Sequence, residues 1–547
     1  MKKGDILEGK VLKTEFPNKG ILNIENQKII VKNALEGQTI RFSVSKKRKD
    51  KVEGRLLEVL APSILEDKCP DCSHFGICGG CTYQNLSYEN QLALKKSQVE
   101  ELIKKSGFDF EIEDIFASPL TRGYRNKMEY TFGDEEKDGP LALGMHRKNS
   151  FYDIVSIKDC QITDSDFNVI LQAILQFFSE RGTAYYHKMR KTGFLRHLVL
   201  RRSVKTGDLL VNLVTTTQDT LDEEAFVSML TELPVDGKIV SILHTLNDGV
   251  ADVVQSDETR LLYGQDYFYE YLFHLRFKIS PFSFFQTNTL GAEVLYEKVW
   301  EYAGEQKDKL IYDLYTGTGT IAQMMAPVAK KVVGVEIVEE AVEAAKRNAV
   351  DNNLTNCEFI AGDVLKVVDN LKEKPDLIIL DPPRDGINPK ALRKIIQFGV
   401  NEMIYVSCKP TSLMRDLEML QEAGYRVKRC CLVDMFPGAV HVETCVLLGR
   451  KIVNDKNVEY MHVDYEPEDA EYLRGIKGSA TYAEIKKWIK EQYNVSVSSL
   501  YIAQCKDACG FEKRENFNTG IEGHRVPNCP EEKKKLILEA FKHFKMI

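Results

Sequence analysis

Short apolar runs alternate with helical periods between Ser283 and Arg450, and this alternation constrains the fold more than any other feature of the sequence. The strand-like runs cover residues 310–314, 331–336, 357–361, 376–381 and 403–407, and the clearest helical period covers residues 338–353. Strands that alternate with helices predict a doubly wound parallel sheet. Ligands bind such sheets at the carboxyl ends of the strands, so the residues that follow these runs are the first candidates for a site.

The length and composition indicate a large globular protein. A chain of 547 residues is too long for one hydrophobic core, and roughly three or four domains are expected. The hydrophobic fraction of 43% and the charged fraction of 28% are typical of soluble globular proteins. Residues 1–8 lack the apolar core of a signal peptide, and no run reaches the roughly 18 apolar residues of a membrane span. We therefore expect a cytoplasmic protein with no membrane partner.

Thirteen cysteines, four of them between positions 69 and 81, suggest metal binding or catalysis in such a compartment, and not disulfides. Cys72, Cys78 and Cys81 form a C-x5-C-x2-C pattern, in which a glycine pair lets the backbone turn tightly. Four thiolates suit zinc or an iron–sulfur cluster, and the fourth could be the nearby Cys69 or the distant Cys160. Zinc sites usually pair two C-x2-C knuckles, and the lack of a second knuckle favours a 4Fe-4S cluster. Reduced surface thiols are the alternative.

The net charge of −7 conceals two basic stretches. Residues 1–60 hold fourteen Lys and Arg against eight Asp and Glu, and residues 183–205 hold seven Lys and Arg and no acid. Basic patches on an acidic protein are the electrostatic footprint of a protein that binds a phosphate backbone. A solvated face is the commoner explanation of either stretch taken alone.

The sequence divides into four expected segments, at residues 1–60, 61–282, 283–452 and 455–547. Strand-like runs in the first segment lie at residues 5–14, 21–24, 28–31, 39–45 and 51–60. Such closely spaced short strands favour a small barrel of the oligonucleotide-binding type, with a basic surface loop at residues 46–49.

The second and fourth segments have weaker patterns. The second begins with the cysteines and a helical stretch at residues 88–105, and then mixes strands and helices. The fourth has a strand-like run at 458–464 and helical periods at 482–493 and 530–544. Its thiols, Cys505, Cys509 and Cys529, are interpreted as buried or free, because no fourth ligand for a metal is evident.

A glycine loop, Asp313-Leu-Tyr-Thr-Gly-Thr-Gly-Thr320, lies between a predicted strand and a predicted helix. The loop lacks the third glycine of the dinucleotide pattern and any phosphate-binding lysine. S-adenosylmethionine, which has no phosphates, therefore fits better than NAD or ATP. The next strand ends in Glu336, where an acid can hold ribose hydroxyls, and Asp363 ends the third strand within reach of an adenine edge. An ordinary glycine-rich turn is the alternative.

The run Ile404-Tyr-Val-Ser-Cys-Lys-Pro410 places a thiol, Cys408, at the carboxyl end of a buried strand. Upstream, Asp381-Pro-Pro-Arg384 resembles the D-P-P-Y motif of amino-methylating enzymes, but its arginine cannot stack on a flipped base as the tyrosine does. The chemistry is therefore expected at carbon. Carbon 5 of a pyrimidine becomes nucleophilic when a thiolate adds to carbon 6, and Cys408 can supply that thiolate.

The same chemistry needs a base to remove the proton from carbon 5. Glu443, at the start of the apolar run His441-Val-Glu-Thr-Cys-Val446, is the candidate, because partial burial there would raise its pKa. If Glu443 stood alone, a strand-edge surface acid would be the preferred interpretation.

Together these motifs resemble those of the bacterial 23S rRNA (uracil-C5)-methyltransferases, over roughly residues 1–450. The motifs are Cys78-Gly-Gly-Cys81, Ser283-Phe-Phe-Gln-Thr-Asn288, the glycine loop, Asp381-Pro-Pro-Arg384, Ser407-Cys-Lys-Pro410 and His441-Val-Glu-Thr444. The resemblance implies a multidomain α/β protein with an N-terminal TRAM barrel, a central α+β domain and a Rossmann-like methyltransferase domain. It implies a 4Fe-4S cluster on Cys72, Cys78, Cys81 and Cys160, with Cys408 as nucleophile and Glu443 as base.

The resemblance also implies cofactor contacts by Gln286, Tyr315, Glu336 and Asp381. With the loop and the third strand included, the expected cofactor site comprises Gln286, Tyr315, Thr320, Glu336, Asp363 and Asp381. Tyr315-Thr316 stands where many members have Phe-Cys, a change that should keep the ring contact with the cofactor. The barrel and the cluster are expected to separate this chain from tRNA-specific relatives, which should resemble only its later part.

The motifs favour a monomeric enzyme that transfers a methyl group from S-adenosylmethionine to carbon 5 of a uridine in 23S rRNA. A cytosine-C5 methyltransferase is a same-class alternative, but the acid that it needs at cytosine N3 is not evident. A non-catalytic RNA-binding or ribosome-assembly factor is the alternative from another class. Intact Cys408 and Glu443 argue against it.

Overall fold

The computed structural model describes most of the chain, in two compact units. The described residues are 1–48, 51–250, 257–371, 373–450, 482–493, 495, 497, 501, 502, 505 and 530–544. The first unit is Met1–Val453 and the second is Asn454–Ile547.

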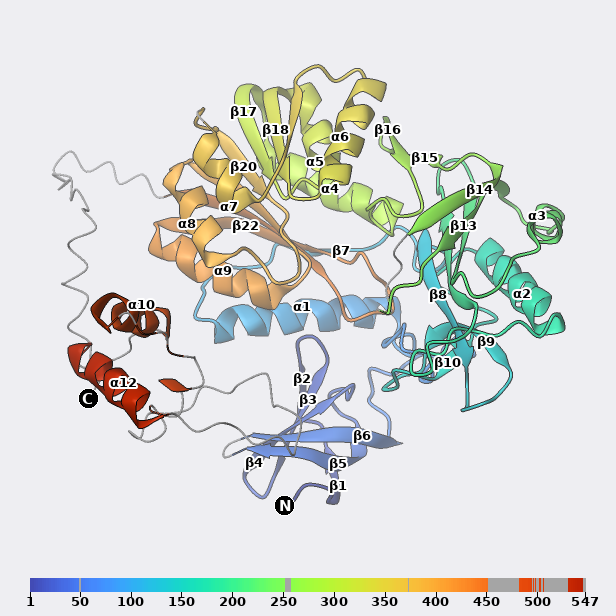
Figure 1. The fold of residues 1–547 in the computed structure, drawn as a ribbon, viewed down its shortest axis with the longest axis horizontal. Helices are drawn as coiled ribbons and strands as arrows, with labels where there is room; N and C mark the ends of the chain where they lie inside the picture. The colour runs from blue at the N-terminus through green and yellow to red at the C-terminus, as the bar shows by residue number, and fades with distance from the viewer. Residues whose placement is uncertain are drawn as a thin grey trace. The chain divides into compact units, whose positions relative to one another are not determined.

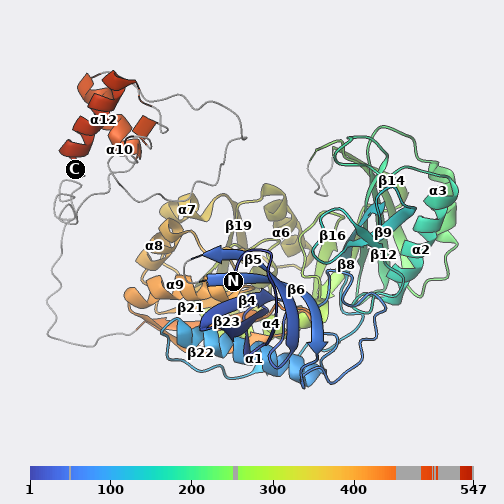
Figure 2. The same ribbon diagram turned by 90° about the horizontal axis from the view of Figure 1, so that it is seen from below.

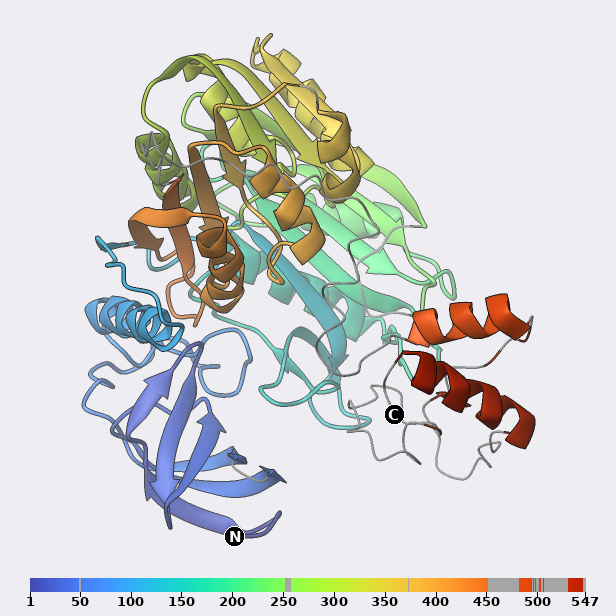
Figure 3. The same ribbon diagram turned by 90° about the vertical axis from the view of Figure 1, so that its left-hand side faces the viewer.

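The N-terminal part of the first unit is a strongly curved six-stranded sheet in the order β1-β5-β6-β4-β3-β2 (Figure 3). Its strands are β1 (Ile6–Lys10), β2 (Lys13–Glu15), β3 (Lys19–Ile24), β4 (Gln27–Lys32), β5 (Thr39–Arg48) and β6 (Lys51–Ala61). Alternate residues such as Ile29 and Val31 of β4 are buried in a small core of their own, as the pleat of a one-sided sheet requires.

The strand expected over residues 5–14 is two strands, and this corrects the sequence interpretation. The N–H of Val11 donates to the carbonyl of Gln38 at 2.8 Å, and the N–H of Leu12 donates to the carbonyl of Ile21 at 2.8 Å. The backbone therefore changes partners at this point, because β1 pairs with β5 whereas β2 pairs with β3.

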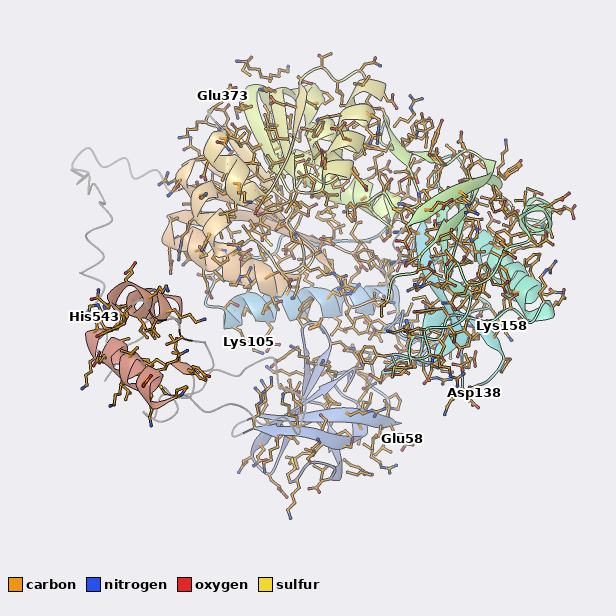
Figure 4. The ribbon with its side chains drawn as sticks, in the orientation of Figure 1. Glu58, Lys105, Asp138, Lys158, Glu373 and His543 are labelled. Carbon is orange, nitrogen blue, oxygen red and sulfur yellow. The ribbon has the colours of Figure 1, made fainter. Side chains whose placement is uncertain are left out.

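Helix α1 (Tyr88–Lys105) matches the helical stretch predicted for these residues. It contacts the N-terminal sheet through Lys105, labelled in Figure 4, whose ammonium lies 2.7 Å from the Glu15 carboxylate. On the same helix, Lys95 and Asp434 form a fully buried ion pair at 2.7 Å, and Lys95 also donates to the carbonyl of Phe436 at 3.1 Å. Helix α1 thus contacts both the N-terminal sheet and the segment beyond residue 433 (Figure 1).

The central part is a seven-stranded sheet in the order β10-β9-β8-β11-β12-β13-β14. Its strands are β8 (Lys127–Asp134), β9 (Leu141–His146), β10 (Ile154–Ser156), β11 (Leu195–Arg202), β12 (Asp208–Thr215), β13 (Lys238–Leu246) and β14 (Glu258–Gly264). Helices α2 (Ser165–Glu180) and α3 (Glu223–Thr231) cover one face (Figure 2). Phe177, Phe178 and Phe226 from these helices stack in the core beneath them.

Part of the basic stretch at residues 183–205 is not an open cationic surface, because residues 195–202 form β11, an inner strand between β8 and β12. Arg196 and Arg201 are only 3% and 2% exposed. Arg202 is paired with Asp166 at 2.5 Å. The guanidinium groups of β11 therefore satisfy polar groups inside the protein, whereas Arg190, Lys191 and Lys205 are exposed, so for these residues phosphate binding stays a prediction.

The third part is an eight-stranded sheet in the order β19-β18-β17-β20-β21-β23-β22-β7. Its strands are β7 (Ile115–Phe116), β17 (Gln306–Leu314), β18 (Ala329–Glu336), β19 (Cys357–Ala361), β20 (Leu377–Leu380), β21 (Glu402–Ser407), β22 (Tyr425–Val433) and β23 (Glu443–Arg450). Strands β17 to β21 are mutually parallel, as the sequence predicts, whereas β23 runs antiparallel to both of its neighbours. The hairpin of β15 (Phe268–Leu272) and β16 (Leu275–Ile279) lies between the central sheet and β17 in the chain.

Helices cover both faces of the eight-stranded sheet, which confirms the predicted mixed α/β fold. The helices that follow β16 are α4 (Thr289–Ala303), α5 (Thr320–Met325), α6 (Glu339–Asp351), α7 (Val364–Val367), α8 (Pro389–Gln397) and α9 (Pro410–Glu422). Helices α4, α5 and α6 share one core with Ile311 of β17, and α1, α8 and α9 share another with Tyr312. Successive residues of β17 thus point to opposite faces.

The second unit is described over two helices, α10 (Tyr482–Tyr493) and α12 (Glu531–His543), both close to the predicted ranges. They share an apolar core that includes the buried Cys505, and Trp488 stacks on His543 with ring centroids 4.8 Å apart. The predicted strand at 458–464, Cys509 and Cys529 lie outside the described residues. Among the described helices of the whole chain, none combines the length and the apolar character needed to span a bilayer.

Candidate active site

A cavity of about 1560 Å³ lies where the carboxyl ends of the parallel strands meet, and it brings together every site residue that the sequence predicts. These residues are Cys72, Cys78, Cys81, Cys160, Gln286, Tyr315, Thr320, Glu336, Asp363, Asp381, Cys408 and Glu443. They come from all along the first unit, so the fold gathers them although the sequence separates them. The cavity is the candidate active site.

The glycine loop forms one wall of the cavity. Asp313, the last residue but one of β17, is buried and accepts a hydrogen bond from the N–H of Ala322 at 3.0 Å, so it ties the loop to the first turn of α5. Tyr315 has a positive φ of 70°, which is uncommon for a non-glycine residue and marks a constrained functional turn. Gly317 donates its N–H to the Glu336 carboxylate at 3.1 Å. The loop therefore carries its own contact with the predicted ribose-binding acid.

Two acids follow the neighbouring strands. Glu336 is the last residue of β18, as predicted. Asp363 does not end the third strand, because β19 stops at Ala361 and the N–H of Gly362 turns back to the carbonyl of Glu336 at 2.8 Å. Asp363 instead caps α7, accepting from the N–H of Leu365 at 3.0 Å. The turn keeps Asp363 on the cavity wall beside Glu336.

Cys408 and Glu443 are brought together by strand pairing. In the antiparallel pair β21–β23, Ser407 lies opposite Thr444. Cys408 follows Ser407 and Glu443 precedes Thr444, so this register places the two residues next to each other at the strand ends, close enough for the charge of Glu443 to affect the thiol. Both side chains line the cavity.

Burial and mutual repulsion perturb the pKa values of this group. Burial, followed by the negative charge of Asp381, raises the pKa of Glu443 to about 8. Burial is the main cause that raises the pKa of Asp381 to about 7, and the negative charge of Asp313 adds to it. Burial is also the main cause that raises the pKa of the Cys408 thiol to about 11, and the negative charges of Glu443 and Asp381 add to it. A carboxyl group with a pKa near neutrality is suited to general acid–base chemistry.

Arg384 and His441 also line the cavity, although the sequence interpretation gives them no role there. The positive charge of Arg384 opposes the rise in the pKa of both Glu443 and Cys408. Burial is the main cause that lowers the pKa of His441 to about 4, and the positive charge of Arg384 adds to it. The imidazole is therefore neutral at physiological pH. Arg384 ends the Asp381–Arg384 motif and His441 begins the His441–Thr444 motif. Their positions in these motifs are the sequence signal that could have identified them as cavity residues.

Arg201 is a supporting residue that the sequence did not indicate. Its guanidinium is buried and donates to the carbonyls of Ser280 at 2.7 Å and Ser283 at 2.8 Å. This segment leads to Gln286, whose carbonyl accepts from the side-chain amide of Asn126 at 2.9 Å. Within a basic stretch, an arginine that binds buried carbonyls cannot be told apart from a surface charge by sequence alone.

Four thiols line the cavity close to one another. Burial, followed by the charge of Cys160, raises the pKa of Cys81 to about 12, and Cys72 and Cys78 also contribute to this rise. Cys69 is exposed and does not line the cavity. Among the residues that the structure describes, no set of three or more His, Cys, Asp or Glu side chains is already arranged around a metal position. The thiols are thus neighbours without a preformed coordination sphere.

Comparisons with known proteins are consistent with this site. A family model described as tRNA (uracil-5-)-methyltransferase matches residues 87–451. An uncharacterized RNA methyltransferase of Clostridium tetani is 48% identical over 454 residues, which cover 82% of this chain and 99% of that protein. Another, from Clostridium acetobutylicum, is 47% identical over 456 residues, covering 83% of this chain and 99% of that protein.

A solved structure extends the likeness to the fold. The tRNA (uracil-54, C5)-methyltransferase of Pyrococcus abyssi, in complex with S-adenosyl-L-homocysteine, is 27% identical with a TM-score of 0.64. The match covers 81% of this chain and 100% of that chain. The expectation that tRNA-specific relatives resemble only the later part of this chain is therefore wrong.

The raised pKa of Glu443 generates a stability prediction. The carboxyl group ionises near 4.5 in the unfolded chain and near 8 in the folded protein, so the wild type loses stability as the pH rises between these values. Glu443→Gln removes this loss. Its unfolding free energy relative to wild type should increase by about 3 to 4 kcal/mol between about pH 5 and pH 8. Denaturant titrations at several pH values measure it.

The exposed carboxyl group of Glu422 on α9 provides the control. Glu422→Gln should leave the pH dependence of stability as in wild type, because water solvates this side chain in both states. A difference between Glu443→Gln and wild type that stays constant with pH would contradict a buried, protonated Glu443.

Proposed function

Because this chain belongs to the tRNA (uracil-5-)-methyltransferase family, whose members are S-adenosylmethionine-dependent RNA methyltransferases, we propose that it methylates carbon 5 of a uridine in 23S rRNA through a covalent adduct on Cys408. The observation that carries the proposal is the β21–β23 register, which brings Cys408 and Glu443 to neighbouring positions at the cavity that the glycine loop also lines. A nucleophile and a base close to one ring are what methylation at carbon 5 requires.

The cavity offers a suitable set of groups for S-adenosylmethionine, which supplies an electrophilic methyl group when bound. Gln286, Tyr315, Thr320, Glu336, Asp363 and Asp381 are the proposed binding residues. Glu336 is placed to accept hydrogen bonds from ribose hydroxyls, as an acid at the end of the second strand does in related folds. Asp381, raised in pKa by burial and by Asp313, would be stabilised in its ionised form by a cationic ligand.

In the proposed reaction Cys408 adds to carbon 6 of the uracil, and the resulting enolate makes carbon 5 nucleophilic. The raised pKa of Cys408 means that the free enzyme holds a thiol, so its proton must pass to solvent as the substrate binds. Arg384, which favours the ionised thiol, assists this step. Carbon 5 then accepts the methyl group. Glu443, in its ionised form, takes the remaining proton from carbon 5, and Cys408 leaves carbon 6 as a thiolate.

The two half-reactions can be separated by mutation. Cys408→Ala should bind RNA but lower 5-methyluridine formation by at least about 10³-fold, because the nucleophile is missing. Glu443→Gln should complete addition and methylation and then stall, slowing turnover by about 10² to 10⁴-fold. It should accumulate a methylated protein–RNA adduct that survives denaturing gel electrophoresis.

Controls make this test specific. Cys408→Ala and the double variant should form no adduct. Cys357→Ala, which removes another partly buried thiol outside the cavity, should turn over like wild type. Normal turnover by Glu443→Gln with no trapped adduct would assign the base to another residue.

The choice of 23S rRNA rests on the resemblance, whereas a tRNA uridine is the second candidate because the solved relative acts on tRNA uracil-54. We expect a deletion strain to lack 5-methyluridine at one or more positions of 23S rRNA and to keep it in tRNA. Nucleoside mapping of both RNA fractions by mass spectrometry decides the matter. Loss confined to tRNA would replace the rRNA proposal without affecting the chemistry.

We also propose that Cys72, Cys78, Cys81 and Cys160 hold a 4Fe-4S cluster. Burial, with a smaller contribution from the neighbouring thiols, raises the pKa values of Cys72, Cys78 and Cys81, a cost that a bound metal cation would offset, and the donor type suits iron–sulfur chemistry. Side-chain rotations must bring the sulfurs around the cluster, because they are not yet arranged for it. The N-terminal sheet would be the TRAM domain of the expected four-segment organisation.

Anaerobically purified protein should be brown and contain about four irons per chain. Cys160→Ser should lose iron, whereas Cys69→Ser should keep it, because Cys69 is exposed and lies outside the cavity. Iron analysis and the visible absorption spectrum measure both. Stoichiometric zinc without iron would refute the cluster, and the reverse mutant pattern would make Cys69 the fourth ligand.

A further inference from the structure

The tip of the β9–β10 hairpin, residues 147–152, exposes two neighbouring aromatic rings. Phe151 is 84% exposed and Tyr152 is 67% exposed. Aromatic side chains bury a large apolar surface when a partner is available, so two adjacent rings held in water indicate a binding surface. Neither ring belongs to the apolar cores of the described structure.

The backbone of this tip is well organised, so the rings are held outward by structure. Arg147 donates its N–H to the carbonyl of Asp153 at 2.8 Å, and Ser150 donates its N–H to the carbonyl of Arg147 at 3.0 Å. The Ser150 hydroxyl accepts from the N–H of Tyr152 at 3.3 Å and from that of Asp153 at 3.2 Å. A preorganised loop loses little conformational entropy when a ligand binds.

Two cations flank the rings. Arg147 and Lys148 are partly buried, and within the described residues neither side chain forms an ion pair. Arg190 and Arg202 in the same part of the protein, in contrast, are paired with Asp138 and Asp166. On a chain with a net charge of −7, unpaired cations beside exposed rings favour an anionic ligand with flat groups.

The tip is attached to the cysteine end of the cavity. Lys148 donates its N–H to the carbonyl of Ile77 at 2.7 Å, and Gly79 donates its N–H to the carbonyl of His146 at 3.1 Å. Met145, one strand position before this contact, lines the cavity itself. A strand of RNA with one uridine in the cavity would therefore have its neighbouring nucleotides within reach of the tip.

We propose that the β9–β10 tip binds single-stranded substrate RNA, stacking bases on Phe151 and Tyr152 and contacting phosphates through Arg147 and Lys148. Exposed rings and cations in one short loop suit single-stranded nucleic acid, because every base offers a π-face and every nucleotide a phosphate. The inference rests on the proposed function, since it assigns further contacts to the RNA whose uridine enters the cavity. A protein ligand would need a complementary apolar surface and would not compete with RNA.

The test measures binding of a labelled single-stranded oligouridylate to the full-length protein, purified anaerobically, by fluorescence anisotropy across a salt series. Phe151→Ala and Tyr152→Ala should each weaken binding about tenfold at every salt concentration, because stacking does not release counterions. Arg147→Ala and Lys148→Ala should each reduce the slope of log affinity against log salt by about 0.7. Lys309→Ala, an exposed lysine near the amino end of β17, is the control and should match wild type.

A thermal unfolding midpoint equal to that of wild type verifies that each variant keeps its fold. Unchanged affinity of the two aromatic variants, or no binding of the oligouridylate by wild type, would overturn the inference. Measuring 5-methyluridine formation separately keeps the two proposals distinguishable. If wild-type protein forms no 5-methyluridine while the binding variants behave as expected, the proposed reaction fails and the RNA-binding tip stands.

Discussion

The antiparallel insertion of β23 is the constraint on which the rest of the site depends. Parallel strands alone collect the glycine loop, Asp381 and Cys408 at one edge of the sheet, because all their carboxyl ends lie there. They cannot place a second group opposite Cys408. Strand β23 runs the other way, so its first residue, Glu443, lies at the same edge, next to Cys408. The carboxyl group and the thiol are thereby fixed by backbone hydrogen bonding and not by flexible loops.

The buried Lys95–Asp434 pair holds the segment that makes this return possible. Asp434 follows β22, and the chain from there to β23 carries Phe436 and His441 into the cavity. A buried ion pair recovers its desolvation cost only with good geometry and further hydrogen bonds. Here Lys95 also donates to the carbonyl of Phe436, and the Asp434 carboxylate accepts from the backbone N–H of Phe436 at 3.1 Å. Helix α1, far away in the sequence, thus fixes one wall of the site.

The buried carboxyl groups of the cavity lower the stability of the folded protein while they provide groups suited to proton transfer. Asp313, Asp381 and Glu443 all have raised pKa values because they are buried near one another. Burial and the nearby negative charges make ionisation of each group less favourable than it is in water. Such a cluster of perturbed carboxyl groups is typical of active sites, where function and not folding determines the arrangement. The raised pKa of Glu443 is the property that a base acting near neutral pH needs.

The sequence by itself determined the local elements and the chemical groups. The five parallel strands and helices α1 and α10 were predictable, and so was the choice of twelve candidate residues that line one cavity, because periodicity and motif spacing depend on neighbours in the chain. Only the tertiary structure decided which groups meet. In the structure the arginines of β11 bind carbonyl and carboxylate groups inside the protein. Asp363 caps a helix and does not end a strand, and Glu443 lies next to Cys408. Charge partners, burial and strand direction depend on residues distant in sequence, and one-dimensional patterns do not record these contacts.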